Sequence, residues 1–166
     1  MRRVLSILME NEPGALSRIV GLFSQRGYNI DSLAVAKTED PTLSRLTLST
    51  SGDEKVLEQI TKQLNKLIDI HKVMNITERD HVERELMLIK LQAVSSHVRS
   101  EIKRTADIFR AHVIDVSSHT YTVQMVGSRE KLKAFIAAVQ EETEVIEVVR
   151  SGTVGILRGK KALRAS

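Results

Sequence analysis

The residues whose types and spacing could carry chemistry stand in one short stretch, "MENEPGALSRIV", where a predicted strand gives way to a predicted helix. The first turn of a helix presents unpaired N–H groups and a partial positive charge. With Gly14 and Ala15 at that turn, a carboxylate can approach the backbone closely and accept those N–H groups. Within this stretch, no cation precedes Arg18. The stretch therefore favours a small zwitterion over a phosphate.

Two asparagines stand beside this turn. Asn11 offers both a donor and an acceptor to the polar end of a ligand. Asn29 follows Gly27, and we expect it near the same edge of the sheet after the chain turns back. Pro13 suits the first helical position. A plain capped helix followed by a turn asparagine remains an alternative on these residues alone.

Other chemistry has little support in the sequence. The chain has no cysteine, which excludes disulfides and thiolate chemistry. The five histidines form no i, i+4 pair, so we expect no metal site. Ser100 and Lys103 match a Ser-x-x-Lys pattern without its companion motifs. We predict no catalytic residues, and a chain that is not an enzyme on its own.

The composition, 42% hydrophobic and 28% charged, is that of a folded domain. We expect a cytoplasmic protein, since no apolar run approaches the roughly 18 residues of a membrane span and the N-terminus turns acidic too early for a signal peptide.

The net charge of +4 comes from residues 150–166, which contain no acids. We expect a solvated basic tail there, with a partner or nucleic-acid contact as the alternative. The three phenylalanines fall on apolar helix faces, which disfavours base stacking.

Hydrophobic periodicity predicts the order strand, helix, strand, strand, helix, strand over residues 3–76. The strand over 29–36 has a small-residue face that includes Ala36, and the strand over 43–50 alternates apolar and polar residues. Gly27 is expected to close the first helix in a left-handed conformation. The stretch from Ser51 to Glu54 resembles a capping box for the second helix.

The chain then repeats this pattern. An offset of 75 residues carries Gly52 to Gly127, Leu57 to Leu132 and Ile60 to Phe135, which indicates two copies of one architecture. We predict an α+β protein of two ferredoxin-like βαββαβ domains, residues 1–77 and residues 78–166, the second carrying the basic tail. Domains of this size bury limited surface, so we expect a second copy of the chain to cover exposed sheet, forming a homodimer.

Two stretches carry a family resemblance: "NEPGALSRIVGLFSQRGYNIDSLAVA" and the following "TLSRLTLST". They closely resemble the N-terminal ACT domain of the acetolactate synthase small subunit, the regulatory subunit of acetohydroxyacid synthase. The shorter patterns Asn-x-Pro-Gly-x-Leu and Gly-x-Asn-Ile recur across amino-acid-sensing ACT domains. The resemblance covers essentially the whole chain, more loosely after residue 80, and reaches "SGTVGILRG".

The resemblance implies a regulatory function without catalysis. Members bind a catalytic subunit that carries thiamine diphosphate, magnesium and FAD, raise its activity and make it inhibitable by valine. Valine lies between two ACT domains, in contact with the loop before the first helix of one chain and the second strand of its neighbour. The residues of this chain that the resemblance assigns to valine are Asn11, Gly14, Ala15 and Leu16 around the carboxylate, Asn29 and Ile30 from the second chain, and Ala36, a position linked to valine sensitivity.

The second unit carries no such loop. Its equivalent stretch, "QAVSSHV", lacks Asn, Pro and Gly. We therefore expect no amino-acid site there, but a role in dimerisation and in modulating the partner. A free-standing ACT-type sensor acting on another partner remains the alternative function, although no helix-turn-helix pattern is evident.

Overall fold

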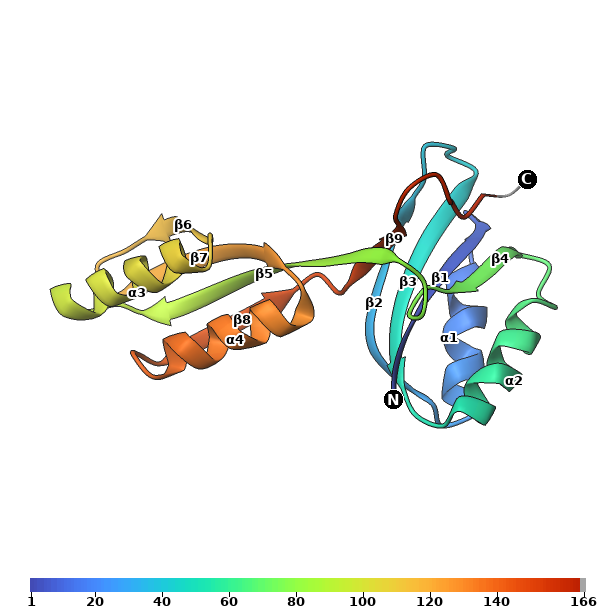
Figure 1. Ribbon diagram of the computed structural model, residues 1–166, viewed down its shortest axis with the longest axis horizontal. Coiled ribbons are helices and arrows are strands. Elements are labelled where there is room, and N and C mark those ends of the chain that lie inside the picture. Colours follow the sequence, from blue (N-terminus) through green and yellow to red (C-terminus); the bar gives the residue numbers. More distant parts are fainter. Residues whose placement is uncertain (165–166) are drawn as a thin grey trace. The chain divides into compact units, whose positions relative to one another are not determined.

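The computed structural model describes residues 1–164, which form two compact units. The first unit comprises Met1–Val82 together with the chain from Thr153 onward, and the second comprises Glu83–Gly152. This division differs from the expected boundary after residue 77, because the C-terminal segment, residues 153–164, belongs with the first unit. Figure 1 shows both units in sequence colours.

The first unit is a four-stranded antiparallel sheet with two helices on one face (Figure 1). Its elements in chain order are β1 (Arg2–Glu10), α1 (Ala15–Gln25), β2 (Asn29–Lys37), β3 (Leu43–Ser51), α2 (Glu54–Leu64) and β4 (Ile70–Asn75). The strand order is β2-β3-β1-β4. This is the ferredoxin-like arrangement that the sequence predicts. Gly27 has a φ of 62°, as expected for a left-handed residue after α1.

The helix-facing side of this sheet forms the first core. Leu5 and Ile7 of β1 pair with Leu48 and Leu46 of β3, and all four are buried beneath α1 and α2. Phe23 from α1 packs edge-on against Tyr28, with the ring centroids 6.1 Å apart. The alternation of apolar residues along β1 and β3 therefore faces the helices, as the strand period requires.

The other side of the sheet, which we call the outer face, is covered in part by the chain itself. Val4 of β1 packs against Ile76 and Leu157, the last residue of β9 (Val154–Leu157). The Arg45 guanidinium donates a 2.7 Å hydrogen bond to the Leu163 carbonyl, and Leu163 is buried. The expectation of a solvated basic tail is thus wrong for this segment. Apolar residues at 157 and 163 anchor it, while its basic side chains stay exposed.

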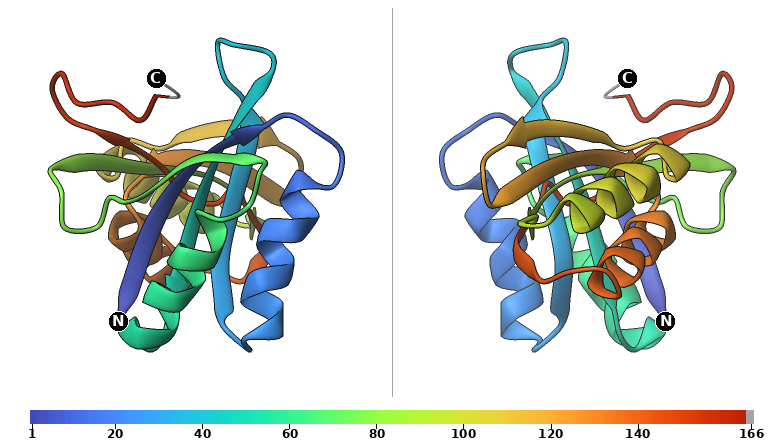
Figure 2. Two further views of the ribbon diagram at one scale, coloured as in Figure 1. Left: turned by 90° about the vertical axis from the view of Figure 1, so that its right-hand side faces the viewer. Right: turned by 90° about the vertical axis from the view of Figure 1, so that its left-hand side faces the viewer.

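The second unit repeats the fold. Its elements are β5 (His81–Gln92), α3 (Ser96–Ile108), β6 (His112–Val116), β7 (Thr120–Gly127), α4 (Arg129–Gln140) and β8 (Val145–Arg150), with strand order β6-β7-β5-β8. Helices α3 and α4 lie together on one face of this sheet, as the right view of Figure 2 shows. Phe109 and Phe135 meet edge-on in its core at 5.4 Å.

The offset of 75 residues is confirmed as a structural repeat. Leu57 and Leu132 are both buried, and so are Ile60 and Phe135.

The N-terminal caps of the corresponding helices differ from the expectation in one respect. The N-cap of α2 is Asp53, whose carboxylate accepts from the Lys55 N–H at 2.8 Å, so the predicted capping box does not form. In the second unit, Ser128 caps α4.

An ion pair joins the two neighbouring strands β5 and β8. Arg150 donates from Nε to one Glu85 oxygen at 2.6 Å and from Nη2 to the other at 3.2 Å. The Glu85 side chain is 4% exposed, whereas that of Arg150 is 36% exposed. Arg150, which the sequence groups with the basic tail, is therefore a strand residue that neutralises a buried carboxylate.

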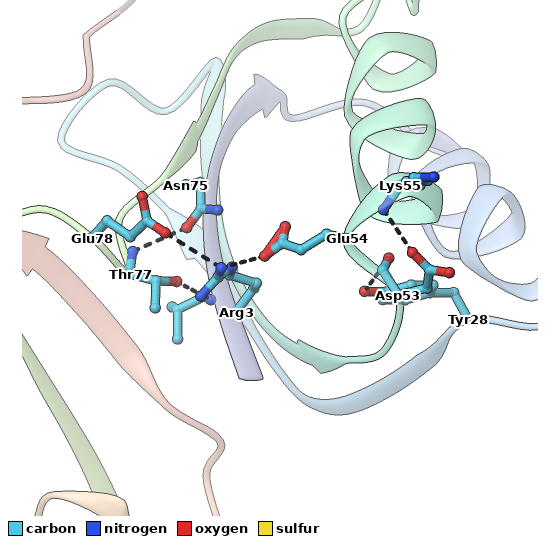
Figure 3. Close-up of polar contacts among 9 residues, drawn as sticks. Arg3, Tyr28, Asp53, Glu54, Lys55, Asn75, Thr77 and Glu78 are labelled. Carbon is cyan, nitrogen blue, oxygen red and sulfur yellow. Dashed lines mark hydrogen bonds and ion pairs between the residues drawn. The ribbon is translucent and has the colours of Figure 1, made fainter. Parts of the chain in front are cut away.

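Tyr28 lies where β2 approaches the start of α2, and its hydroxyl donates to the Asp53 carbonyl at 3.3 Å (Figure 3). Gly52, with φ of 150°, leaves room for the ring, since a Cβ there would lie 2.9 Å from Tyr28 Cε2. Burial, and then the nearby carboxylates of Glu54 and Asp53, raise the pKa of the Tyr28 hydroxyl. The folded state thus prefers the neutral phenol.

We expect Tyr28→Phe to reduce the free energy of unfolding by about 1 kcal/mol near neutral pH, because one hydrogen bond is lost. A raised folded pKa contributes stability that is present below the unfolded value, about 10, and is lost as pH rises through the folded value. The gap between the wild-type protein and Tyr28→Phe should therefore narrow above about pH 10. Urea unfolding of both at neutral and alkaline pH measures this. A gap independent of pH would contradict the assignment.

Candidate functional site

The turn between β1 and α1 depends on a glycine for its backbone. Helix α1 begins at Ala15, and its N-cap, Gly14, has φ 88° and ψ −14°. Such left-handed values favour glycine over residues with a Cβ. Pro13 lies in the preceding turn rather than at the first helical position, which corrects the expectation for that residue. Gly14 is thus required by conformation as well as by any close ligand approach.

The first turn of α1 keeps two backbone donors free. The Ala15 N–H donates to Glu12 O at 3.3 Å and the Arg18 N–H to Gly14 O at 3.0 Å. Between them, the N–H groups of Leu16 and Ser17 have no hydrogen-bond partner among residues 1–164. The N-cap itself offers none, because glycine has no side chain. Two adjacent donors at a helix N-terminus suit a carboxylate.

Arg18 adds a cation that the sequence analysis did not assign to this site. Its Nε donates to Asp69 Oδ2 at 2.6 Å, and its Nη2 contacts the same oxygen. Its Nη1 would lie 3.1 Å from a Cβ built on Gly14 and has no partner in the described part of the chain. Arg18 stands four residues after Gly14, which is about one helical turn. In the sequence, this spacing was the signal that could have placed the Arg18 side chain beside the turn. Asp69 therefore holds a guanidinium beside the free amides.

Asn11 is engaged by the protein itself. Its Nδ2 donates to the Pro41 carbonyl at 3.2 Å, and its Oδ1 accepts from the Ser44 hydroxyl at 3.2 Å. These contacts fasten the loop before α1 to the hairpin between β2 and β3. Each polar atom of the Asn11 amide retains capacity for one further hydrogen bond. Asn11 thus positions the turn and can still contact a ligand.

Ala15 and Leu16 contribute differently from each other. The Ala15 side chain is 1% exposed and belongs to the first core, so only its backbone faces the turn. Leu16 is half-buried and packs against that core from its edge. Its exposed part is the apolar surface closest in sequence to the free amides. The turn therefore presents backbone donors, one guanidinium and one partly exposed leucine.

Asn29 and Ile30 lie at the opposite end of the same sheet. Asn29 pairs with Ser51 of β3, whereas Glu10, at the end of β1, pairs with Leu43. Eight residues of β3 separate these positions, or about 26 Å at the usual rise of a strand. The expectation that Asn29 comes near the same edge as Asn11 is wrong for a single chain. No free amino acid can contact both asparagines of one copy.

Ala36 lies on the outer face of β2. It pairs with Arg45 of β3, one position from the Lys37–Ser44 pair. It lines a hollow of about 400 Å³ together with Ala34, Thr47, Val154 and Ile156. Of the predicted residues, Ala36 therefore lies at the Asn11 end of the sheet but on the face turned away from the helices.

The described residues offer neither a metal site nor a membrane-spanning helix. No group of three His, Asp or Glu side chains in residues 1–164 is placed to hold a metal ion. Among the same residues, no helix is both long and apolar enough to cross a membrane.

Both units match family models. Residues 5–72 match the AHAS small subunit-like ACT domain, and residues 84–159 match the small subunit of acetolactate synthase. The acetolactate synthase isozyme 3 small subunit of Escherichia coli is 58% identical over 164 residues, covering 99% of this chain and 100% of that protein. The chain belongs to the acetolactate synthase small-subunit family. A probable family member from Archaeoglobus fulgidus is 45% identical over 161 residues, covering 97% of this chain and 99% of that one.

A solved member of this acetolactate synthase family has the same fold. The crystal structure of the Thermotoga maritima acetolactate synthase small subunit superposes with a TM-score of 0.85 at 36% identity. It covers 97% of this chain and 99% of that chain. The likeness therefore extends over both βαββαβ units, and the family's ACT domain corresponds to the unit that carries the Gly14 turn.

Proposed function

We propose that this chain is the regulatory subunit of an acetolactate synthase. It binds the catalytic subunit, raises its activity and confers feedback inhibition by valine in branched-chain amino acid biosynthesis. Its relatives are named as small subunits of acetolactate synthase, which supports a catalytic subunit as its partner. The observation that carries the effector site is the pair of free N–H groups at Leu16 and Ser17 beside the unpaired Nη1 of Arg18. Together these groups can donate to one carboxylate without displacing any hydrogen bond of the fold.

The proposed site is completed by a second copy of the chain. The Gly14 turn of one copy supplies donors for the carboxylate, and the start of β2 in the other supplies Asn29 and Ile30. The separation of these residues within one copy is the reason for placing them on two. The Asn29 Nδ2 donates to Asp31 Oδ1 at 2.8 Å, which orients the amide, while its Oδ1 has no partner in residues 1–164. That oxygen is a suitable acceptor for an ammonium group.

The energetics of such a site are feasible. Small ligands reach about −1.5 kcal/mol per heavy atom at best, so micromolar binding of valine, about −8 kcal/mol, lies well within the limit. Inhibition requires that valine bind one arrangement of the subunits more tightly than another, typically by about 1–3 kcal/mol. A ligand held between two copies can supply this difference, because it stabilises one packing of the pair.

Thiamine diphosphate, magnesium and FAD are assigned to the catalytic subunit, and this chain contributes no step of the reaction. Cytoplasmic location follows from that partnership and remains part of the proposal. We propose that the second unit supports dimerisation and modulates the partner. Its helix α3 is capped by Ser95, whose hydroxyl accepts from the Val98 N–H, so this helix start is already occupied by a side chain. The Gly14 turn has no such cap.

Reconstitution with the catalytic subunit tests this function. We expect the chain alone to be inactive, to raise the activity of the catalytic subunit severalfold, and to make that activity sensitive to valine at micromolar to millimolar concentration. Turnover with and without valine, at fixed catalytic subunit, is the measurement. Activation without any response to valine would remove the effector role and leave the partnership. Failure to bind the catalytic subunit would remove the proposed function.

A further inference from the structure

A cavity of about 550 Å³ lies between the outer face of the first sheet and the C-terminal segment. Ser6 of β1 and Met74 of β4 line it on the sheet side, and residues 159–164 line it on the other. Leu157, just before this stretch, and Leu163, within it, are both buried and hold the segment in place. In Figure 1 the segment runs beyond β9 on the side of the sheet away from α1 and α2. The cavity is therefore separate from the Gly14 turn.

The side chains around this cavity carry an excess of positive charge. Arg45, Lys160, Lys161 and Arg164 line it, against a single acid, Glu39. Lys160, Lys161 and Arg164 form no ion pair within residues 1–164. Like charges held close together repel one another unless a counter-charge lies among them. An anion in the cavity would remove this repulsion.

Two buried polar atoms at this cavity have no partner in the described chain. The Ser6 side chain lines the cavity, the residue is 3% exposed, and its Oγ makes no hydrogen bond. Arg45 uses Nη2 to bind the Leu163 carbonyl, but its Nε is buried and unpaired. A buried polar group without a partner loses its hydration without a compensating hydrogen bond, which destabilises the folded state. Such groups are uncommon in native proteins, and both of these are donors to an anion.

A bound water molecule would not satisfy all the groups around this cavity. Met74, Ile76 and Ile156 make much of the lining apolar, and the volume is far larger than one water requires. A water bound to Ser6 would satisfy its hydroxyl but leave the four cations without a counter-charge. An anion satisfies both requirements at once, since its oxygens accept from Ser6 and Arg45 while its charge faces the lysines.

We propose that this cavity binds a small multivalent anion, bearing phosphate or carboxylate groups, which fastens the C-terminal segment to the outer face of the first sheet. Ser6 and Arg45 bind it from the sheet, and Lys160, Lys161 and Arg164 bind it from the segment. The ligand thereby stabilises the folded position of residues 159–164. This site is independent of valine binding and of the catalytic partner, so its test does not bear on the proposed function.

The test uses the full chain in a buffer without phosphate. Pyrophosphate and citrate are titrated separately while backbone amide chemical shifts are recorded. We expect saturable shifts at Ser6, Arg45 and residues 155–164, and a rise in melting temperature with ligand concentration. A response to pyrophosphate alone identifies a phosphate ligand, and a response to citrate alone identifies a carboxylate. Absence of saturable shifts with both anions overturns the proposal.

Two variants and a control sharpen this test. Lys160→Ala/Lys161→Ala should weaken binding about ten-fold, because two positive charges are lost from exposed positions where water weakens their attraction for the anion. Ser6→Ala should weaken binding about three-fold, yet leave the anion-free protein no less stable, since its hydroxyl has no partner to lose. The control, Lys62→Ala/Lys66→Ala, removes the same charge from exposed positions in and after α2 of the same unit. Equal weakening by this control would show nonspecific charge attraction and overturn the site.

Discussion

Replacing Gly14 by aspartate is expected to abolish valine inhibition while leaving activation of the catalytic subunit intact. An aspartate carboxylate at this N-cap would lie beside Arg18 Nη1 and the free N–H groups of Leu16 and Ser17. It would occupy the anion position from within the chain and repel the valine carboxylate. Losing two charge-assisted bonds corresponds to an increase of about 100-fold or more in the valine concentration for half-inhibition. Turnover of the reconstituted enzyme against valine measures this.

Gly14→Ala is the matched control for backbone strain. It adds a Cβ at the same left-handed position, at a cost of about 1 kcal/mol, but it adds no acceptor and no charge. The close neighbour of this Cβ is the end of the flexible Arg18 side chain, which can move aside. We expect valine inhibition to persist in Gly14→Ala. If Gly14→Ala and Gly14→Asp lose inhibition equally, the carboxylate does not bind at these amides.

Mixing two insensitive variants tests whether the site spans two copies. Gly14→Asp damages the turn, and Asn29→Ala damages the start of β2. In a symmetric pair, one of the two sites of a mixed dimer combines an intact turn with an intact Asn29. Random mixing makes about half of the dimers mixed, so about a quarter of all sites should recover valine binding. No recovery after mixing would show that valine is not held between the Gly14 turn of one copy and Asn29 of the other.

We expect Arg150→Met to lower the free energy of unfolding strongly, because it breaks the ion pair with Glu85 in the second unit. Arg150→Met leaves the Glu85 carboxylate, 4% exposed, without its guanidinium partner. Removing one member of a buried pair typically costs about 3–5 kcal/mol. Because Arg150 is partly exposed and water can reach the site, we expect the lower end, about 3 kcal/mol. Urea unfolding, with amide exchange in β5 and β8 to locate the loss, measures it.

A double variant distinguishes the contribution of charge neutralisation to stability from the contribution of side-chain packing. Glu85→Met/Arg150→Met removes both charges and keeps comparable apolar volume, which is often close to neutral for buried pairs. We therefore expect the double variant to be more stable than Arg150→Met by about 2 kcal/mol. If the two are equally unstable, the arginine acts through its hydrocarbon chain rather than by neutralising Glu85.

Most of the secondary structure could be predicted from local pattern. The strand alternation of residues 3–10, the helical spacing from Leu16 to Phe23 and the offset that relates Leu57 to Leu132 all describe residues close together or a pattern repeated along the chain. Periods of 2 and 3.6 residues decide which face of an element is apolar. The ferredoxin-like units follow from these periods and from the order of the elements.

The candidate site was predictable only in part. The free amides follow from a helix whose N-cap is a glycine, which is a local property. The neighbouring contacts are not local, because Arg18 is held by Asp69 and Asn11 by Pro41 and Ser44. Each of these pairs joins segments separated by about thirty residues or more. Sequence spacing carries no information on such pairs until the strand register is known.

Sequence by itself determined the duplicated βαββαβ pattern, the glycine turn before α1 and the family. Tertiary structure alone decided that Asn11 and Asn29 lie at opposite ends of one sheet and that Leu157 and Leu163 bring the C-terminal segment back onto the outer face. The physical reason is the range of the interactions. Backbone propensity and hydrophobic period act over one or two turns, whereas register and the burial of distant apolar residues depend on the whole unit being folded.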